Sequence, residues 1–481
     1  MNVTALIVFV IFLGIIFFVG LLSGKGGGKT EEEYYTGGRS FGALPTAISA
    51  GATNGSGWLF IGACGWSYTV GAASMWMLPG FVLGFIIENA LIAPRLRYQS
   101  NKLGAMSVSD FLAKKLDDQW KTINTAVRLV AALILVFFFL PYMSTQLMAA
   151  GKTMQVVTGI NYTLGLVLSA VFVTAYCFVG GYKSVIYTDM LQGLLMAFIL
   201  LFIPMYFILI RFGGWHSFWK TINDIDPLML TSAYGAKGGA LISFALGWVL
   251  YGVGNIGQPH ISQRYITARN DKTLKGVAYI SLGWMIIAMT GSNLLGLCGR
   301  IILPNLSDPE YVFPAIVAQQ LNPVIIGLVV GAIASAIMST FSSQLMVAVQ
   351  SIASDILNSM SKKVYTEKQK VLISRFIMLL CSFLATLIAL MNLDSVFALV
   401  NYAWSGIAAS FAPLMILLLT RPCLVNKEGA IASLIIGPTI TTIWYILGLN
   451  SKIHEIAPGM ISAAIVCILI SKAFDKKYQS S

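Results

Sequence analysis

The sequence predicts an all-α membrane protein with thirteen transmembrane helices. Three observations lead to this prediction: 57% of the 481 residues are hydrophobic, only 10% are charged, and the mean hydropathy is +0.79. Soluble domains are about 25% charged, because their surfaces face water. Thirty-one Lys and Arg with 19 Asp and Glu are too few to cover a soluble protein of this length, so lipid must cover most of the surface. An ordinary soluble enzyme is excluded.

Thirteen apolar stretches come near the roughly 20 residues that an α-helix needs to cross the hydrocarbon. The first runs from Val3 to Leu22, and Lys and Arg occur only after it. A secretory signal peptide has its cations in front, so we expect this stretch to remain as a transmembrane helix. The other twelve cover about residues 41–66, 74–94, 127–150, 160–181, 186–210, 239–260, 277–299, 322–350, 371–391, 396–420, 429–448 and 456–473.

The distribution of cations predicts the orientation of these helices. If the N-terminus lies outside, the cytoplasmic segments hold 25 of the 31 Lys and Arg residues, including Arg264 in the segment 264–275. An excess of Lys and Arg in cytoplasmic loops is the usual pattern of multi-pass proteins. We therefore expect a lipid-embedded protein of the plasma membrane (the inner membrane of a bacterium) with a cytoplasmic C-terminus. The net charge of +12 then reflects orientation and indicates no nucleic-acid partner.

Two clusters of glycine and polar residues interrupt the apolar pattern, at 49–58 and 246–260. Glycine is common where membrane helices pack closely, which is one interpretation of either cluster alone. Two such clusters five spans apart instead favour a core of two inverted five-helix repeats, each with a first helix broken in mid-membrane. The predicted organisation is a single membrane transport domain with an extra helix over 1–24, repeats over 41–210 and 239–420, and two C-terminal helices over 429–473.

A third cluster, over residues 331–344, places many hydroxyl groups in an otherwise apolar helix. Such hydroxyls can bond to the carbonyls of their own previous turn, which is the alternative to a binding role. Hard cations such as Na⁺ prefer oxygen ligands. The hydroxyls of Ser339 and Thr340, together with carbonyls from a broken helix, would form a cation site without a buried fixed charge.

Ionisable side chains inside apolar spans are candidates for function, because burying a charge in lipid is costly. Asp189 lies near the cytoplasmic end of the span 186–210 and is a candidate for ion coupling, with a structural ion pair as the alternative. Glu88 lies in the span 74–94, nearer an interface, and for it the alternative to a functional role is a snorkelling or paired carboxylate. The scattered cysteines and three His residues indicate no metal site, and no nucleophile or phosphate-loop motif of an enzyme is present.

Seven motifs together resemble the sodium/solute symporter family, and most closely its bacterial sodium/proline branch. They occur in the order of the family and cover nearly the whole chain. They are G-G-R-S-F-G (37–42), S-A-G-A-T-N-G-S-G-W (49–58), G-G-Y-K-S-V-I-Y-T-D-M-L-Q-G (180–193), G-Q-P-H-I (257–261), M-S-T-F-S-S-Q-L (338–345), L-V-N-Y-A-W-S-G (399–406) and G-A-I-A-S-L-I-I-G (429–437). The resemblance implies thirteen spans, an outside N-terminus and inverted repeats. Hydropathy and charge predict the first two independently.

The resemblance also implies the residues of the site. The co-transported Na⁺ would lie between the first broken helix and the hydroxyl-rich helix. Its ligands would be the carbonyls of Ala52, Gly55 and Ala336 and the hydroxyls of Ser339 and Thr340. The substrate contacts would be Asn54, Ser56, Trp58, Tyr142, Tyr251, Asn255 and Pro259, and Asp189 would take part in coupling.

Three positions depart from the proline branch. Asn54 stands where that branch has an Asp that is important for sodium, so the charge is missing while one oxygen is kept. Tyr251 and Asn255 stand where it usually has Trp and Tyr. A smaller amide in place of an aromatic wall should loosen a pocket made for a proline ring and add a polar partner.

The resemblance implies a sodium-coupled symporter that imports a small amino acid, proline first, by alternating access. The departures keep alternatives open: another small zwitterion or amine, and coupling to H⁺ or weak coupling to Na⁺. A membrane sensor with a transporter-like body is a more distant alternative. We expect no enzymatic activity. Which solute is carried, the ion stoichiometry and the oligomeric state do not follow from the sequence.

Overall fold

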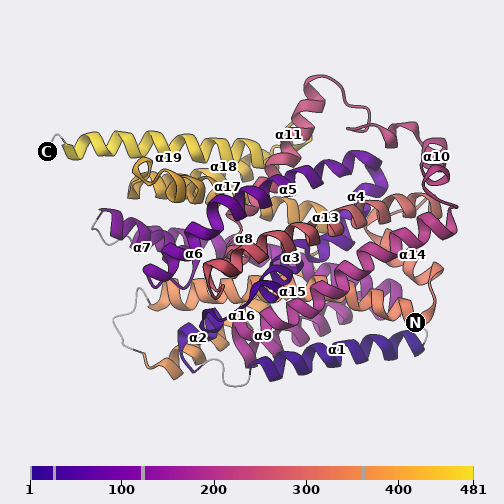
Figure 1. Cartoon of the computed structure of the whole chain (residues 1–481), viewed down its shortest axis with the longest axis horizontal. Helices are drawn as coiled ribbons and strands as arrows, with labels where there is room; N and C mark the ends of the chain where they lie inside the picture. Colours follow the sequence, from indigo (N-terminus) through magenta and orange to yellow (C-terminus); the bar gives the residue numbers. More distant parts are fainter. Residues whose placement is uncertain (1–2, 25–28, 121–124, 359–364, 480–481) are drawn as a thin grey trace.

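The computed structural model describes residues 3–24, 29–120, 125–358 and 365–479, and Figure 1 shows them as a bundle of helices. Every regular element in these ranges is a helix, and one isolated β-bridge joins Phe41 to Ala268. The start of α1 and the end of α19 lie at opposite ends of the bundle (Figure 1). That placement agrees with an odd number of membrane crossings.

The helices fall into three groups by length. The longer helices are α1 (Val3–Gly24), α8 (Thr125–Thr158), α9 (Tyr162–Tyr206), α13 (Asp271–Ile302), α15 (Pro323–Gln350), α16 (Glu367–Met391), α17 (Val396–Thr420), α18 (Lys427–Ile446) and α19 (Ile456–Gln479). The shorter ones are α2 (Glu31–Thr36), α3 (Ala43–Phe60), α4 (Gly62–Val70), α5 (Met77–Ile87), α6 (Ala93–Lys102), α7 (Val108–Trp120), α10 (Trp215–Ile225), α11 (Gly239–Val253), α12 (Pro259–Ile266) and α14 (Val312–Gln320). Short 3₁₀ or π segments are η1 (Gly37–Arg39), η2 (Gly71–Trp76), η3 (Glu88–Ile92), η4 (Phe207–Arg211), η5 (Pro227–Leu230), η6 (Gly254–Gly257), η7 (Pro309–Tyr311), η8 (Ser351–Asn358), η9 (Pro422–Leu424) and η10 (Leu449–Ser451).

Eleven helical stretches of the described residues are long and apolar enough to cross a membrane. They differ from the predicted thirteen at two places. The broken helix α3 is not among them, because it is short and polar for a membrane span. The predicted spans 160–181 and 186–210 merge into one stretch of 50 residues, which kinks at Gly181 (φ 57°, ψ −153°). At 1.5 Å per residue this stretch is long enough to cross twice, and the count of thirteen stays a prediction.

Polar side chains explain where several helices begin. The side chain of Asn270 accepts a hydrogen bond from the Thr273 N–H at the start of α13 (2.9 Å), and Asn322 accepts from the Ile325 N–H at the start of α15 (3.0 Å). Thr366 begins α16 with a reciprocal capping box. These caps satisfy N–H groups that have no partner within the first turn of a helix.

Burial separates a central layer of helices from a peripheral one. In their most apolar windows, α17 is 83% buried and α15 is 78% buried, against 22% for α1. Figure 1 accordingly places α3 and α15 in the middle of the bundle, with α1 along one edge and α18 and α19 along the opposite edge. The hydroxyl-rich cluster therefore lies in the centre of the protein.

Two helices are broken where glycine and proline predict a break. Within α3, Ser56 has φ 52° and ψ 177°, and a glycine lies on each side of it. The second break separates α11 from α12 through η6, and Gln258 between them is extended (φ −94°, ψ 102°). A residue before proline is pushed out of the helical region, and Pro259 follows Gln258. The prediction of two broken helices is confirmed, and their separation by five spans stays a prediction together with the count of thirteen.

Candidate functional site

The first half of α3 faces the hydroxyl-rich part of α15. The Ser339 hydroxyl lies 3.2 Å from the carbonyl oxygen of Ala52 and 3.2 Å from that of Ala336. The Thr340 hydroxyl donates to the carbonyl of Thr53 at 2.8 Å. Four of the five predicted sodium ligands therefore lie along one contact between two helices, and every protein atom that they offer is an oxygen.

The break at Ser56 explains why these carbonyls are available. A residue with non-helical φ and ψ ends the regular bonding ladder, so backbone groups beside it need other partners. The N–H of Gly57 donates to the side-chain oxygen of Gln146 in α8 at 2.8 Å. The carbonyls of Ala52 and Thr53 accept from α15, as described above. Gly55, the fifth predicted ligand, directly precedes the break.

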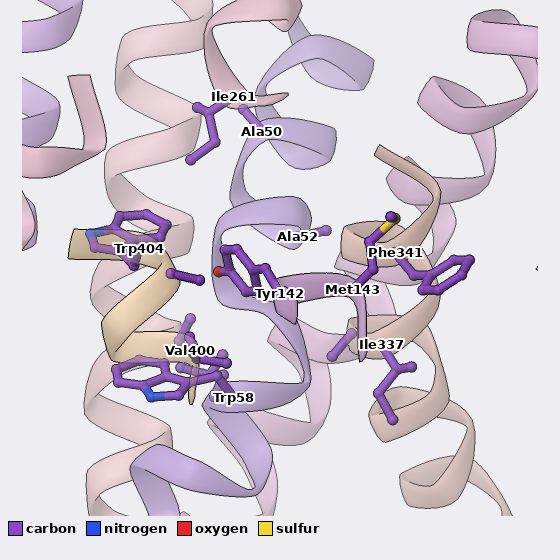
Figure 2. Close-up of a cluster of buried hydrophobic side chains, with 14 of the residues drawn as sticks. Ala50, Ala52, Trp58, Tyr142, Met143, Ile261, Ile337, Phe341, Val400 and Trp404 are labelled. Atoms are coloured by element: carbon purple, nitrogen blue, oxygen red, sulfur yellow. The ribbon is translucent and has the colours of Figure 1, made fainter. Parts of the chain in front are cut away.

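Aromatic side chains from five elements (α3, α8, α11, α12 and α17) surround the opposite face of the break. Trp58 and Tyr251 have ring centroids 6.1 Å apart, and Tyr251 stacks on Trp404 at 5.5 Å. His260 contacts Tyr142 at 6.0 Å and Trp404 at 6.5 Å. Figure 2 shows the Tyr142 hydroxyl pointing towards the side where Trp58 and Trp404 lie, with the α15 side chains on the other side of the ring. We call these five residues the aromatic enclosure.

The structure gathers the predicted substrate contacts around this enclosure, and all of them are buried. The Asn54 amide donates to the side-chain oxygen of Asn255, which joins the two broken helices directly. The Ser56 hydroxyl accepts a hydrogen bond from the backbone N–H of Trp58 at 3.1 Å. Pro259 occupies the first turn of α12, where a missing N–H costs nothing.

Several polar atoms in the enclosure and at the adjacent Asn54 lack a hydrogen-bond partner among the described residues. They are Asn54 Oδ1, the indole Nε1 of Trp58 and both ring nitrogens of His260. Buried polar atoms are normally paired, and unpaired ones cost free energy. This set combines an acceptor with hydrogen-bond donors, which is the combination that a zwitterionic solute requires.

Asp189 lies in a fully buried ion pair. One of its carboxylate oxygens accepts from the Arg264 guanidinium at 2.8 Å and from the Ser49 hydroxyl at 2.8 Å. Arg264 also donates to the hydroxyls of Thr53 (2.8 Å) and Ser343. The pair thus joins α9 and α12 to α3 and α15, one turn from the Ser339 contact. Asp189 therefore forms the ion pair that was expected as the alternative to a coupling role. This pair lies next to the predicted cation site.

Two expectations about charges were wrong. Arg264, assigned to a cytoplasmic segment, has no exposed surface, because it reaches inwards from α12 to Asp189. Glu88, expected near an interface as a snorkelling or paired carboxylate, is also fully buried and does not snorkel, and its partners are the Asn255 amide and the Tyr265 hydroxyl. Buried charges are usually paired, so a search for a partner of Asp189 would have pointed to a nearby cation such as Arg264. The spacing of residues along the chain gave no sign that Trp404 and His260 lie beside the predicted substrate contacts.

Among the described residues, no group of three or more His, Cys, Asp or Glu side chains could hold a metal ion. The candidate ion site therefore rests on hydroxyls and carbonyls. That donor set suits an alkali cation, which takes oxygen ligands and does not require a cluster of fixed charges.

Comparison with known proteins identifies the family. The model of the sodium:solute symporter family matches residues 34–437. The chain belongs to this family. The osmoregulated proline transporter OpuE of Bacillus subtilis (strain 168) is 33% identical over 472 residues, which cover 96% of this chain and 94% of the relative. The sodium/proline symporter of Staphylococcus aureus (strain JH9) is 32% identical over 490 residues, which cover 99% and 94%.

Solved structures of transporters share the fold. A Na⁺-coupled sialic acid symporter in a substrate-bound outward-open state has a TM-score of 0.78 at 18% identity, and 98% of each chain is covered. A nucleobase-cation-symport-1 family transporter in a closed conformation has a TM-score of 0.55 at 13% identity, with 92% of this chain and 95% of that chain covered. These likenesses confirm the predicted fold class.

Family membership confirms several predictions at the level of the family. The protein is a multi-pass membrane protein and a sodium-coupled symporter, with Na⁺ as the co-transported ion and a small molecule as the substrate. Its relatives are transporters, so the prediction that it is not an enzyme is confirmed. The residues that bind the ion and the solute stay predictions.

Removing the Thr340 hydroxyl should weaken sodium dependence. For Thr340→Ala we expect the Na⁺ concentration for half-maximal uptake to rise about tenfold, because one hydrogen bond or ligand at a charge contributes about 1.5 kcal/mol or more. Thr340→Ser keeps the hydroxyl and should stay near wild type. The control Ser335→Ala removes a hydroxyl that bonds only the Gly331 carbonyl of its own helix (2.7 Å). An identical Na⁺ dependence for Thr340→Ala and Ser335→Ala would contradict the site.

Breaking the buried ion pair should destabilise the fold more than removing it. Asp189→Asn leaves the Arg264 charge buried without its carboxylate, which costs about 3–5 kcal/mol in comparable pairs. The double variant Asp189→Asn with Arg264→Met removes both charges and should recover part of the lost melting temperature. Thermal unfolding in detergent measures both. A double variant less stable than the single one would show that the charges themselves are not the cause.

Proposed function

We propose that the protein imports a small amino acid, with proline as the first candidate, and that Na⁺ entry drives the import by alternating access. Two relatives at 33% and 32% identity are named as proline transporters, which supports the solute class. The unpaired acceptor at Asn54 and the unpaired donors at Trp58 and His260 support a solute that carries both an ammonium and a carboxylate.

One observation carries this proposal: the candidate ion site and the aromatic enclosure share a single break in α3. The carbonyls of Ala52 and Thr53 face α15, and six residues after Ala52 the side chain of Trp58 forms part of the enclosure. Discontinuous helices serve secondary transporters in this way, because free carbonyls reach the ion while the helix ends reach the solute.

The shared break suggests how coupling works. A Na⁺ between Ala52, Ser339 and Thr340 would hold the first half of α3 against α15. Residues 54–58 would then be fixed in the conformation that contacts the solute, so bound Na⁺ would raise solute affinity. Because coupling free energy is reciprocal, bound solute would raise Na⁺ affinity by the same factor. The repeats over 41–210 and 239–420 would then rock around the loaded site.

Each site residue receives a role in this proposal. We assign Na⁺ binding to Ala52, Gly55, Ala336, Ser339 and Thr340. We assign solute contact to Asn54, Ser56, Trp58, Tyr142, Tyr251, Asn255 and Pro259. The buried pair of Asp189 and Arg264 would hold α12 against α3 on one side of the ion and would break or shift when the site opens there. An outside N-terminus and a cytoplasmic C-terminus complete the proposal.

A second solute class is favoured by the contact between Asn54 and Asn255. An amide pair lies where the proline branch has a carboxylate and an aromatic ring, so another small zwitterion or an amine with an additional polar group could fit better than proline. Tyr251 retains an aromatic wall beside this pair. The identity of the solute is therefore the first quantity to measure.

A thermal-shift screen of amino acids and small amines tests the function. The purified protein would be heated with each compound in NaCl and, as a matched control, in choline chloride. A true substrate should raise the melting temperature in NaCl and much less in choline, since a ligand at about 100 times its Kd stabilises by about 2.7 kcal/mol. A stabilising ligand that acts equally in both salts would overturn sodium coupling. Stabilisation by no amine or amino acid would overturn the solute class.

A further inference from the structure

Glu88 is a buried carboxylate without a cationic partner. It begins η3 and has no exposed surface. Within the residues that the structure describes, no Lys or Arg forms an ion pair with it. Its Oε2 atom accepts from the Asn255 amide and from the Tyr265 hydroxyl at 3.3 Å, and its Oε1 atom has no hydrogen-bond partner. An acid buried at this cost inside a membrane protein is expected to serve a function.

Close glycine packing brings this carboxylate to the second broken helix. A Cβ on Gly80 would lie 2.3 Å from the Trp248 carbonyl oxygen, and one on Gly84 would lie 2.2 Å from the Gly252 carbonyl oxygen. No side chain fits at these contacts, so the two helices pack closely. Because the contact moves from Trp248 to Gly252 as the chain moves from Gly80 to Gly84, α5 and α11 run in the same direction. Glu88 follows Gly84 by one turn and therefore meets the polypeptide just beyond Gly252, at Asn255. The contact between Glu88 and Asn255 is therefore fixed by the close packing of α5 against α11.

The chemistry of the carboxylate fixes the direction of two amides. A carboxylate oxygen only accepts, so Asn255 must turn its NH₂ group towards Glu88. The carbonyl oxygen of Asn255 then faces Asn54, and Asn54 must turn its own NH₂ group towards it. As a result, the atom left without a partner is Asn54 Oδ1, an acceptor. A proton on Oε1 of Glu88 would leave this direction unchanged, because Oε2 would still accept.

We propose that Glu88 is a positioning residue for the solute: through Asn255 it orients Asn54 so that Asn54 Oδ1 accepts from the ammonium group of the transported molecule. This inference rests on the proposed function, because it requires an amine-bearing solute. Glu88 need not touch the solute. Its Oε2 atom supplies the acceptor that begins a chain of polarised amides, and such chains strengthen the hydrogen bond at their far end.

The geometry favours the solute over Na⁺ as the partner of Asn54. The Asn54 side chain reaches η6 and the second broken helix, where Tyr251 and Trp58 form the enclosure. The candidate ligands of Na⁺ lie instead between α3 and α15, with Ser339 and Thr340. An unpaired acceptor beside an aromatic enclosure matches an ammonium group, which donates hydrogen bonds and is attracted to ring faces.

We call the hydrogen-bonded chain from Glu88 through Asn255 to Asn54 the relay. Moving the carboxylate from position 88 to position 54 tests it. Glu88→Gln keeps the size but allows either amide direction, so we expect the KM of the solute to rise about tenfold while kcat changes little. Asn54→Asp alone sets a carboxylate against the carbonyl oxygen of Asn255 and should also raise KM. The double variant lets Asn255 turn around and donate to Asp at position 54, so KM should return to within about threefold of wild type.

The controls separate this role from a structural one. Glu428→Gln, a half-buried position in the first turn of α18, should leave KM unchanged. The Na⁺-induced thermal shift measured without solute should be the same in Glu88→Gln as in wild type. A KM for Glu88→Gln equal to that of the control, a double variant no better than the worse single variant, or a lost Na⁺ shift would each overturn the relay.

The same assay distinguishes this inference from the proposed function. Wild-type protein that takes up no amine-bearing solute with Na⁺ would overturn both. Wild-type protein that does so, together with unaltered Glu88→Gln kinetics, would overturn the relay alone. If Glu88 only stabilised the packing around η3, adding Asn54→Asp to Glu88→Gln would restore no bond there. Rescue of KM by the double variant would therefore not be expected for a purely structural Glu88.

Discussion

The break of α3 at Ser56 is the constraint on which the rest of the structure depends. Backbone N–H and C=O groups in a membrane cannot turn to water, so a broken helix persists only where neighbouring side chains supply hydrogen bonds. Gln146 supplies one acceptor, and the hydroxyls of Ser339 and Thr340 supply donors. The glycine-rich sequence of α3 permits the break, and the hydroxyl-rich sequence of α15 supplies hydrogen bonds to the backbone groups that the break leaves free. The same hydroxyl and carbonyl oxygens that hydrogen-bond to each other here can instead bind a cation, so the contact that stabilises the break is also the candidate ion site.

Charges are placed to support this break from both sides. The pair of Asp189 and Arg264 holds α12 against α3 and α15 beside the candidate ion site. Glu88 lies behind the second broken helix and orients the amides at its tip. The family resemblance locates a carboxylate at position 54, and this chain has Asn54 there. The acid of this chain that connects to Asn54 is Glu88, two hydrogen bonds away through Asn255, while position 54 itself keeps an acceptor oxygen.

The sequence predicted those features that follow from local chemistry. Apolar length and the flanking of Ser56 and Gln258 by glycine or proline were enough for a multi-pass fold with two broken helices. Features that depend on which helices meet were not accessible. Arg264 was assigned to a loop because hydropathy treats a cation near a span end as a surface residue, and Glu88 was expected at an interface for the same reason. The G-x-x-x-G spacing of Gly80 and Gly84 indicates close helix packing, but a single sequence does not show which helix packs there or that the contact buries Glu88.

Uptake into proteoliposomes with one imposed ion gradient at a time tests the central claim most directly. The liposomes would contain wild-type protein at equal internal and external pH, with Na⁺ only outside, and would be compared with liposomes that have an inward H⁺ gradient and no Na⁺. The account predicts that proline, or the amine identified in the thermal-shift screen, accumulates above its external concentration with the Na⁺ gradient alone. Accumulation driven by the H⁺ gradient and indifferent to Na⁺ would contradict it.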